Sequence, residues 1–397
     1  MPAHPSSVDV ILPLVSPPTR TLGFPSGYGV TEKSESLQTF AIVKKSRLQQ
    51  NAGKIGQGER VFKMPISRTP RNQSGRKLAS KTAALALLIS CLWLGRSVAQ
   101  SSSSDAPAIQ GKEHYAMRDG LRIYLWEKYR QEEERNFSRT GRVALLVHGG
   151  QRSGRSIYDL QIRDYSLMDF LAQNGYDVWA IDIHGYGHSD KPANDWIDTH
   201  SAAADIAAAV DYIAKLRGVP KINLLGCSAG TQRAGVFTME HPEKVAKLIL
   251  DAGFWKGTAD FREFNRKRIE NGGQPLPRYR ASTEKDFRSD FIEGQYEEDV
   301  VEESVKVGMQ MDPQRPNIFV EWAKLPILDP ARITVPTMII YGEKDFAAKE
   351  EDLLPFYSQL NTHDKRYILL PDGGHMLILE KGHRRFQHEV LSFFDRP

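Results

Sequence analysis

The stretch that decides the fold reads Leu224-Leu225-Gly226-Cys227-Ser228-Ala229-Gly230, an apolar run that ends in the pattern Gly-x-Ser-x-Gly. A helical pattern follows over Gln232–His241. A serine between a buried strand and a helix sits on a strained turn, where a side chain at Gly226 or Gly230 would collide with its neighbours. Such a turn exposes the serine hydroxyl at the carboxyl edge of the sheet. The pattern therefore predicts a nucleophile, Ser228, in a strand–turn–helix unit.

Strand and helix patterns alternate on both sides of this unit. A hairpin signal, Asp119-Gly120, separates His114–Met117 from Leu121–Glu127. The further predicted strands are Val143–Val147, Asp177–Ile181, Ile222–Leu225, Leu248–Leu250, Thr337–Tyr341 and Arg366–Leu370. The predicted helices are Tyr165–Gln173, Ala202–Leu216, Gln232–His241 and Arg384–Phe394. This alternation predicts an α/β fold, in which a mostly parallel central sheet is covered by helices.

The alternation stops between about Trp255 and Leu328. This interval shows no strand pattern and is rich in charge: it holds the basic residues Arg262, Arg266, Lys267 and Arg268 and the acidic run Glu297-Glu298-Asp299. Charge runs of this kind are usually solvated faces of helices. We therefore expect residues of about 255–328 to form a helical cap over one end of the sheet, within a domain that covers residues 113–397.

Three further loops that follow predicted strands carry polar groups. The first is His148-Gly149-Gly150-Gln151, the second contains Asp345 and the third contains His375. An aspartate after a strand is more often a helix cap, and a histidine in a loop is more often plain surface. Together with Ser228, however, they give the order Ser, Asp, His at the carboxyl ends of parallel strands, where catalytic groups gather.

The ordered set of motifs resembles the α/β-hydrolase superfamily, and within it the capped serine esterase-like branch. The matching features are His148-Gly149-Gly150, Asp182-Ile183-His184-Gly185-Tyr186-Gly187-His188-Ser189-Asp190, the turn at Ser228, Gly342-Glu343-Lys344-Asp345 and Gly374-His375. The resemblance runs from about Tyr115 to the C-terminus and is poor across the cap. It implies the α/β-hydrolase fold, with helices on both faces of the sheet and a helical cap insertion.

The resemblance also implies roles for single residues. Ser228 would be the nucleophile, His375 the base and Asp345 the acid that orients the base. The backbone N–H groups of Gly150 and Ala229 would form an oxyanion hole, since two amides aimed at one point need little side chain. A serine nucleophile argues against the dehalogenases and epoxide hydrolases of the superfamily, which use aspartate.

Five other residues leave alternatives open. Asp251 lies near the place where some relatives carry the acid, although the aspartate after the later strand fits that role better. His184 and His188 lie in a loop near the pocket, where either substrate contact or loop packing would explain them. Cys227 departs from the family pattern and is expected to be a small buried residue. Gln151 stands where imino-peptidase-like members have proline, which argues against that substrate class.

These groups predict hydrolysis of a carboxylic ester or lactone through an acyl-enzyme intermediate, with no cofactor and no metal. Two alternatives stay open: serine-dependent C–C or amide hydrolysis at the same site, and a non-catalytic binding protein with this fold. The aromatic residues of the cap are Phe254, Trp255, Phe261, Phe264, Phe287, Phe291, Phe319 and Trp322. They favour a moderately apolar or aromatic small molecule as substrate, unless they form the cap's own core.

Composition narrows the classes of partner. The chain has 397 residues with 53 Lys and Arg, 49 Asp and Glu and a net charge of +4. Residues 1–100 carry 14 of the basic and 4 of the acidic residues, so residues 101–397 have a net charge of −6. This balance argues against a nucleic-acid partner. The 2 cysteines exclude a disulfide-stapled scaffold and a four-cysteine zinc site.

The N-terminal region predicts export. A basic segment, Arg76–Lys81, precedes an apolar run, Thr82–Leu94, and small residues follow at Ser97 and Ala99. This order predicts a signal peptide over residues 64–100 that is cleaved near Ala99, followed by a linker over residues 101–112. The apolar run is shorter than the roughly 20 residues that a spanning helix needs, so no stable membrane span is expected after processing.

Signal peptides begin close to the true N-terminus, so we expect translation to start at Met64. Residues 1–63 would then be a gene-model artefact or a disordered extension. The expected location is secreted or periplasmic. A lipoprotein processed at Cys91 and targeting to an organelle are the alternatives.

Overall fold

The computed structural model describes residues 108–193 and 196–397. The expected extension over residues 1–63, the signal peptide over residues 64–100 and residues 101–107 of the linker lie outside the described residues, and so they stay predictions. Among the helices of the described part, none has the length and apolar character needed to cross a membrane.

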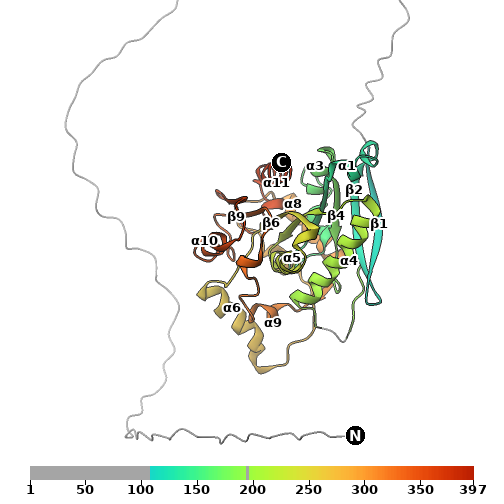
Figure 1. Ribbon diagram of the computed structural model, residues 1–397. Coiled ribbons are helices and arrows are strands. Elements are labelled where there is room, and N and C mark those ends of the chain that lie inside the picture. Colours follow the sequence, from blue (N-terminus) through green and yellow to red (C-terminus); the bar gives the residue numbers. More distant parts are fainter. Residues whose placement is uncertain (1–107, 194–195) are drawn as a thin grey trace, which may run out of the picture. The chain divides into compact units, whose positions relative to one another are not determined.

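An eight-stranded sheet forms the centre of the molecule (Figure 1). Its strand order is β1-β2-β4-β3-β5-β6-β9-β10, and all neighbours from β4 to β10 are parallel. The hairpin of β1 and β2 adds an antiparallel edge. The strands are β1 (Ile109–Arg118), β2 (Leu121–Arg130), β3 (Val143–Val147), β4 (Asp177–Ile181), β5 (Ile222–Cys227), β6 (Val245–Asp251), β9 (Thr337–Gly342) and β10 (Lys365–Leu370).

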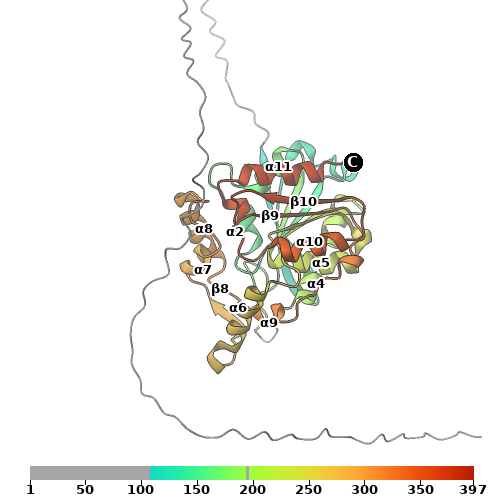
Figure 2. The same cartoon turned by 90° about the vertical axis from the view of Figure 1, so that its left-hand side faces the viewer.

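Helices cover both faces of this sheet, as the sequence predicts. Alternate residues of β3, such as Leu145 and Leu146, belong to separate buried clusters on opposite faces. One cluster contains side chains from α4 (Thr199–Arg217), α5 (Ala229–Glu240) and α10 (Glu350–Gln359). The other contains side chains from α2 (Gly154–Tyr158), α3 (Leu167–Gln173) and α11 (His383–Phe394). Figure 2 shows α11 and α10 on opposite sides of the strands.

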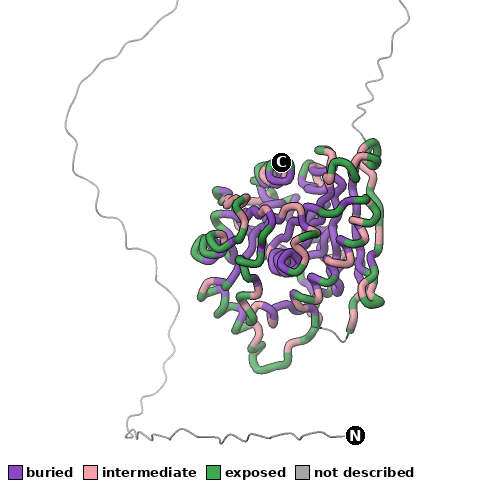
Figure 3. The backbone as a smooth tube through the Cα atoms, viewed as in Figure 1, coloured by how far each residue is buried: buried purple, intermediate pink, exposed green. Residues whose placement is uncertain are grey.

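Burial on both faces explains why the central strands are easy to recognise in the sequence. All five residues of β3, and all six of β5, are buried. Strands of this kind read as continuous apolar runs because neither face meets water. Figure 3 shows the buried backbone concentrated in the sheet and in the inner sides of its helices.

The strand order brings the loop after β3 next to the loop after β5. The chain continues from β3 to its neighbour β4 on one side, and then returns to place β5 on the other side. In open α/β sheets, ligands bind outside the carboxyl ends of strands at such a reversal. The order therefore places the loop that starts at His148 beside the turn at Ser228.

The interval of about 255–328, which we expect to form a helical cap, contains strands as well as helices. It contains α6 (Ala259–Glu270), α7 (Glu284–Arg288), α8 (Glu298–Met311) and α9 (Phe319–Trp322). The expectation of no strand here is wrong, because β7 (Tyr279–Ala281) and β8 (Gln314–Pro316) pair as a small antiparallel sheet. Each strand has only three residues, without apolar alternation, and its partner is distant in the sequence, so no local pattern reveals the pairing.

The cap packs against the domain in two different ways. Phe287 of α7 and Val305 of α8 are buried in the same cluster as α3 and α11, so this half belongs to the main core. On α6 and α9, Phe261 and Trp322 pack with Phe254 in a separate small cluster. The half made of α6 and α9 thus forms a wall with its own aromatic core.

The charge runs of the cap are solvated with one exception. Residues 297–299 are exposed, and so are Arg262, Arg266 and Lys267 on α6. Arg268, however, is only partly exposed and turns towards the interior of the cap. The interpretation of the whole basic run as a solvated face is therefore wrong at Arg268.

Two buried charged residues tie the cap to the loops of the sheet. Arg152, just after β3, donates to the backbone oxygens of Phe287 (2.7 Å) and Ser304 (3.1 Å). In the other direction, the Asp312 carboxylate accepts from the backbone N–H groups of Ser153 (2.8 Å) and Gly187 (2.9 Å). The cap is therefore joined to the loops after β3 and β4 by hydrogen bonds to charged groups, which are among the stronger ones.

We expect Asp312→Ala to lower the free energy of unfolding by about 2–4 kcal/mol, because two backbone N–H groups lose their acceptor. Urea unfolding of the full chain, followed by circular dichroism, measures this change. Glu303→Ala is the control, since Glu303 makes only a surface ion pair with Lys306 and its removal should change the value by less than about 0.5 kcal/mol. Equal losses in the two variants would contradict the role given to Asp312.

Candidate active site

Ser228 occupies a strained backbone conformation between β5 and α5. Its φ is 54° and its ψ is −121°, a region that costs a non-glycine residue about 1–3 kcal/mol. Neighbouring groups hold it there: the Ser228 N–H donates to the backbone oxygen of Asp251 (2.8 Å), and Thr231 donates to the Ser228 carbonyl through both its N–H (2.9 Å) and its hydroxyl (2.6 Å). The strain is thus maintained by the surrounding structure and fixes the direction of the hydroxyl.

The two glycines of the turn allow a close approach of backbones. A Cβ atom at Gly226 would lie 2.4 Å from the backbone oxygen of Gly230. A Cβ atom at Gly230 would lie 2.3 Å from the backbone oxygen of Val147 and 2.7 Å from that of His148. These separations are far below van der Waals contact, so the collision that the sequence pattern predicts is confirmed at both positions.

The structure brings Ser228, His375 and Asp345 together. The hydroxyl oxygen of Ser228 lies 3.0 Å from Nε2 of His375, and Nδ1 of the same ring lies 2.9 and 3.0 Å from the two carboxylate oxygens of Asp345. Asp345 is fully buried and also accepts from the N–H groups of Ala347 (2.7 Å) and Ala348 (3.1 Å). The three side chains follow β5, β9 and β10, which end at the same edge of the sheet.

Asp345 determines the tautomer of His375. Because Nδ1 faces a carboxylate, the ring proton resides there, and Nε2 presents its lone pair to the serine hydroxyl. Burial by itself lowers the pKa of His375, but the charge and hydrogen bond of Asp345 outweigh it, with smaller contributions from Asp290 and Asp251, and the pKa rises above 6.5. The pair therefore favours proton transfer from Ser228 to His375.

The loop after β3 is held in place by several hydrogen bonds, while the N–H of Gly150 donates to no acceptor within residues 108–193 and 196–397. Nε2 of His148 accepts from the N–H of Ile183 (3.0 Å), so its Nδ1 carries the proton and donates to the Gly149 carbonyl (2.7 Å). Arg233 donates to the same carbonyl (3.1 Å). In a trans peptide the Gly149 carbonyl and the Gly150 N–H point in opposite directions, and Gly150 lines the cavity beside the serine.

The second candidate oxyanion donor, Ala229, is the first residue of α5. The N–H groups of the first helical turn have no intrahelical acceptor, and the helix dipole favours negative charge at this end. His148 and Arg233 are contributors that the sequence reading missed. Burial lowers the pKa of His148 to about 3, so its ring is neutral. Its two hydrogen bonds join the Ile183 N–H to the Gly149 carbonyl.

The side chains of the other residues considered from the sequence take no part in the contacts among Ser228, His375 and Asp345 that the described residues make. Asp251 is buried beside Cys227, burial raises its pKa to about 7, and it makes no hydrogen bond to His375 among the described contacts. Cys227 is a buried free cysteine, as expected. His184 is bonded to Asp205, and the half-exposed His188 faces Asp182, so both belong to loop packing.

A cavity of about 340 Å³ opens above Ser228 between the sheet and the cap. Its apolar wall consists of Phe254, Phe261, Phe264, Ile318, Phe319, Trp322 and Phe346. Its polar groups, besides Ser228 and His375, are Gln151, Arg268, Arg280, Ser289 and Asp290. The aromatic residues of the cap thus serve in part as lining of the site. Aromatic walls with a few polar groups are typical of sites for small molecules.

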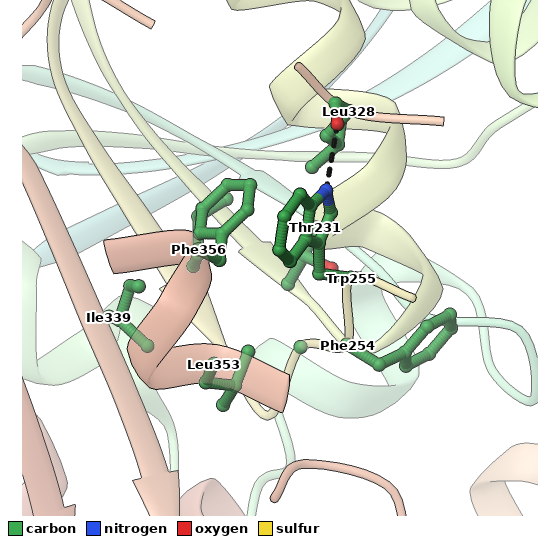
Figure 4. Close-up of a pocket in the computed structure, with 9 residues that line it drawn as sticks. Thr231, Phe254, Trp255, Leu328, Ile339, Leu353 and Phe356 are labelled. Atoms are coloured by element: carbon green, nitrogen blue, oxygen red, sulfur yellow. Dashed lines mark hydrogen bonds between the residues drawn. The ribbon is translucent and has the colours of Figure 1, made fainter. Parts of the chain in front are cut away.

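A second cavity near Phe254 is too small to extend this site. Figure 4 shows it between Trp255, Leu353 and Phe356, where the indole N–H of Trp255 donates to the backbone oxygen of Leu328 (2.9 Å). Its volume is about 10 Å³, hardly the space of one water molecule. We interpret it as a packing gap at the base of the cap. In the part of the chain that the structure describes, no cluster of His, Cys, Asp and Glu could hold a metal ion.

We expect Gly230→Ala to lower the free energy of unfolding by at least about 3 kcal/mol, because the new methyl group would meet two backbone oxygens that have no room to move. Gly382→Ala is the matched control: its φ is −82° and a Cβ atom there meets nothing within 4 Å. Urea unfolding of both variants compares them. Equal stability would contradict the close approach at the turn.

Comparison with known proteins places the chain in a family. A family model described as alpha/beta hydrolase fold matches residues 144–382. The 2-hydroxy-6-oxononadienedioate/2-hydroxy-6-oxononatrienedioate hydrolase of Escherichia coli strain K12 is 26% identical over 251 residues, which are 58% of this chain and 80% of that protein. The protein of the same name from Klebsiella pneumoniae is 35% identical over 94 residues, which are 24% of this chain and only 31% of that protein.

Solved structures agree on the fold. The esterase from Exiguobacterium antarcticum superposes with a TM-score of 0.54 and 21% identity, over 72% of this chain and 100% of that chain. At this identity the likeness concerns the fold alone. With the family match over more than half of its length, and with the strand order and the serine turn described above, the chain belongs to the α/β-hydrolase fold family.

Proposed function

We propose that this protein is a serine hydrolase that cleaves carboxylic esters or lactones through an acyl-enzyme intermediate. The observation that carries the proposal is the line of contacts from Asp345 through His375 to Ser228, with the serine hydroxyl 3.0 Å from Nε2 and facing the cavity. A nucleophile, a base and a group that orients the base are the minimum set for acyl transfer by serine. A protein that only binds its ligand has no need of all three.

The first half of the reaction forms the acyl-enzyme. His375 accepts the hydroxyl proton of Ser228 at Nε2 while the serine oxygen attacks the carbonyl carbon, and Asp345 stabilises the imidazolium that results. The carbonyl oxygen becomes an oxyanion that the N–H groups of Gly150 and Ala229 would hold. Such donors contribute about 3 kcal/mol each in well-studied hydrolases. His375 then gives the proton to the leaving alcohol oxygen.

The second half releases the acid. A water molecule takes the place of the alcohol, His375 accepts its proton, and the hydroxide attacks the acyl carbon. Collapse of the second tetrahedral intermediate returns the proton to Ser228 and frees the carboxylic acid. For a lactone, the alcohol and the acid are parts of one product, so the same steps open a ring.

The relatives named above favour a second candidate, hydrolysis of a C–C bond by the same groups. A compound with the name 2-hydroxy-6-oxononadienedioate contains a ketone and carboxylates but no ester, so its hydrolysis must break a bond between carbons. The match to the E. coli protein covers most of that protein's length at low identity. The aromatic cavity and the serine turn serve both reactions equally, so the low-identity relatives are its only distinct support, and we rank C–C hydrolysis second.

The proposed location rests on sequence features alone. The basic and apolar segments before Ala99 support export, and with it a secreted or periplasmic place of action on a small-molecule ester or lactone.

We expect the full-length protein to react covalently with a fluorophosphonate probe at Ser228, because a serine activated by histidine attacks such electrophiles. Peptide mass spectrometry locates the adduct. Ser228→Ala should abolish labelling and lower ester turnover by at least about 1000-fold. Ser289→Ala is the control, since Ser289 lines the same cavity but donates its hydroxyl to the Asp286 backbone oxygen.

Labelling that persists in Ser228→Ala, or that requires Ser289, would refute the assignment of the nucleophile. A folded protein that neither reacts with the probe nor turns over any acyl ester would favour the binding protein over the hydrolase. Turnover of vinylogous diketones without turnover of esters would favour C–C hydrolysis.

We expect kcat/KM for an ester to rise with pH through the pKa of His375, because only the neutral ring accepts the serine proton. The negative charges of Asp345 and Asp290 raise that pKa above 6.5. Asp290→Asn removes one of these charges, so the acid limb of the pH profile should move to lower pH. Glu293→Gln, which removes an exposed charge nearby, should leave the limb in place. A limb that stays in place in Asp290→Asn, or moves to higher pH, would contradict the electrostatic role of Asp290.

A further inference from the structure

Two arginines of the cap line the cavity above Ser228. Arg268 lies near the end of α6, and Arg280 lies in β7. Their guanidinium groups converge on one ring, that of Phe319, with distances of 4.3 Å for Arg268 and 4.9 Å for Arg280 from the ring centre. The cavity thus has two cations in its lining, both contributed by the cap.

Arg268 has no ion-paired anion. Within residues 108–193 and 196–397, its guanidinium takes part in no hydrogen bond or ion pair, although the charges of Asp286 and Asp290 act on it through space. It lies over the rings of Phe264 (4.5 Å) and Phe319. Arg266, two residues earlier on the same helix, is exposed and is paired with both Glu263 and Glu270. The guanidinium that faces the cavity is therefore left unpaired, whereas the one that faces water is paired.

Arg280 is only partly satisfied. It donates to Oε1 of Gln151 (3.2 Å), while Asp286 lies at 3.5 Å and is shared with Arg315 (3.0 Å). The Nε atom of Arg280 is buried without an acceptor. Burial lowers the pKa of Arg280 to about 10, so it stays charged at neutral pH. A buried N–H group without an acceptor is costly, so an acceptor at this Nε would be favourable.

We propose that Arg268 and Arg280 form a subsite for a carboxylate group of the substrate. This assignment rests on the proposed function, since it names the class of ester or lactone that the same cavity receives. Guanidinium groups present their N–H donors in a planar fork that matches the two oxygens of a carboxylate. A carboxylate bound there would supply an acceptor to the guanidinium of Arg268 and to the Nε of Arg280, which have none among the described residues.

Asp290 gives the substrate an orientation. It is buried, it lines the main cavity, and it also borders the small gap next to Ser228, Gly150 and Met376. Its negative charge raises the pKa of His375. The same charge would repel a second carboxylate from the part of the cavity beside Ser228 and His375. The carboxylate of the substrate therefore lies at the cap wall, away from the scissile carbonyl. The aromatic rings between the two ends favour an apolar or aromatic stem.

A binding experiment tests the subsite without any need for turnover. The full chain with Ser228→Ala is titrated calorimetrically with 4-phenylbutanoate and with its neutral amide, which has nearly the same shape. We expect the carboxylate to bind at least about tenfold more tightly than the amide. Adding Arg268→Gln should reduce this preference to about twofold or less. Adding Arg266→Gln, the same change of charge on the same helix, should preserve it.

The test changes Arg268 and leaves Arg280 intact, because the Arg268 guanidinium makes no hydrogen bond to another element among the described residues, whereas Arg280 bonds to Gln151. Equal binding of acid and amide, or a preference that survives in Arg268→Gln, would overturn the subsite. Absence of binding by either probe would overturn it as well.

A kinetic comparison separates this inference from the proposed function. The wild-type protein is assayed with mono-(4-nitrophenyl) glutarate and with 4-nitrophenyl pentanoate, which differ mainly in the terminal carboxylate. We expect the ratio of their kcat/KM values to favour the glutarate by at least about tenfold and to collapse in Arg268→Gln. Carboxylate-selective binding without hydrolysis of either ester would refute the esterase and retain the subsite. Hydrolysis of both at equal rates would retain the esterase and refute the subsite.

Discussion

The carboxyl edge of this sheet depends on how closely the backbone of α5 approaches its neighbouring strands. With glycine at 226 and 230, the first turn of α5 lies directly against the ends of β3 and β5. That contact forces Ser228 into its positive φ and aims the hydroxyl outwards. It also places the helix N-terminus and the loop that contains Gly150 on either side of the hydroxyl. A single methyl group at Gly230 would push these parts apart. The geometry of the site therefore depends on the same close packing that joins α5 to the sheet.

Three carboxylates raise the pKa of His375, although a single carboxylate is enough to orient the ring. Asp345 holds the ring directly, while Asp290 and Asp251 act through space, and all three favour the protonated ring. Asp345 and Asp251 belong to the sheet edge, but Asp290 belongs to the cap. The cap therefore contributes to the electrostatics of the base as well as to the shape of the cavity. Arg152 and Asp312 join the cap to the loops after β3 and β4 by hydrogen bonds. These bonds keep the cap, and with it Asp290, in a fixed position relative to the site.

The two halves of the cap divide their tasks. The half with α7 and α8 shares the main core of the domain and positions Asp290. The half with α6 and α9 packs on a small aromatic cluster of its own and presents Arg268 to the cavity, while β7 presents Arg280. The first half is therefore part of the main core, and the second half forms much of the cavity wall.

Two features of this protein can be read from local patterns. Strands buried on both faces appear as apolar runs and so define the sheet, and the turn at Ser228 demands glycines at fixed spacing. The same patterns predict that Asp345 and His375 follow strands that end at one edge. Other features depend on the packing of distant segments: which buried carboxylate faces His375, the contacts of His148 and Arg233 with the loop at Gly150, and the pairing of β7 with β8. The inward turn of Arg268, which has no hydrogen-bonded partner among the described residues, is of the same kind. Periodicity records what a residue does within its own helix or strand. Contacts between groups far apart in the chain depend on how the helices and strands pack, to a precision of a few tenths of an ångström. No local sequence pattern contains that information.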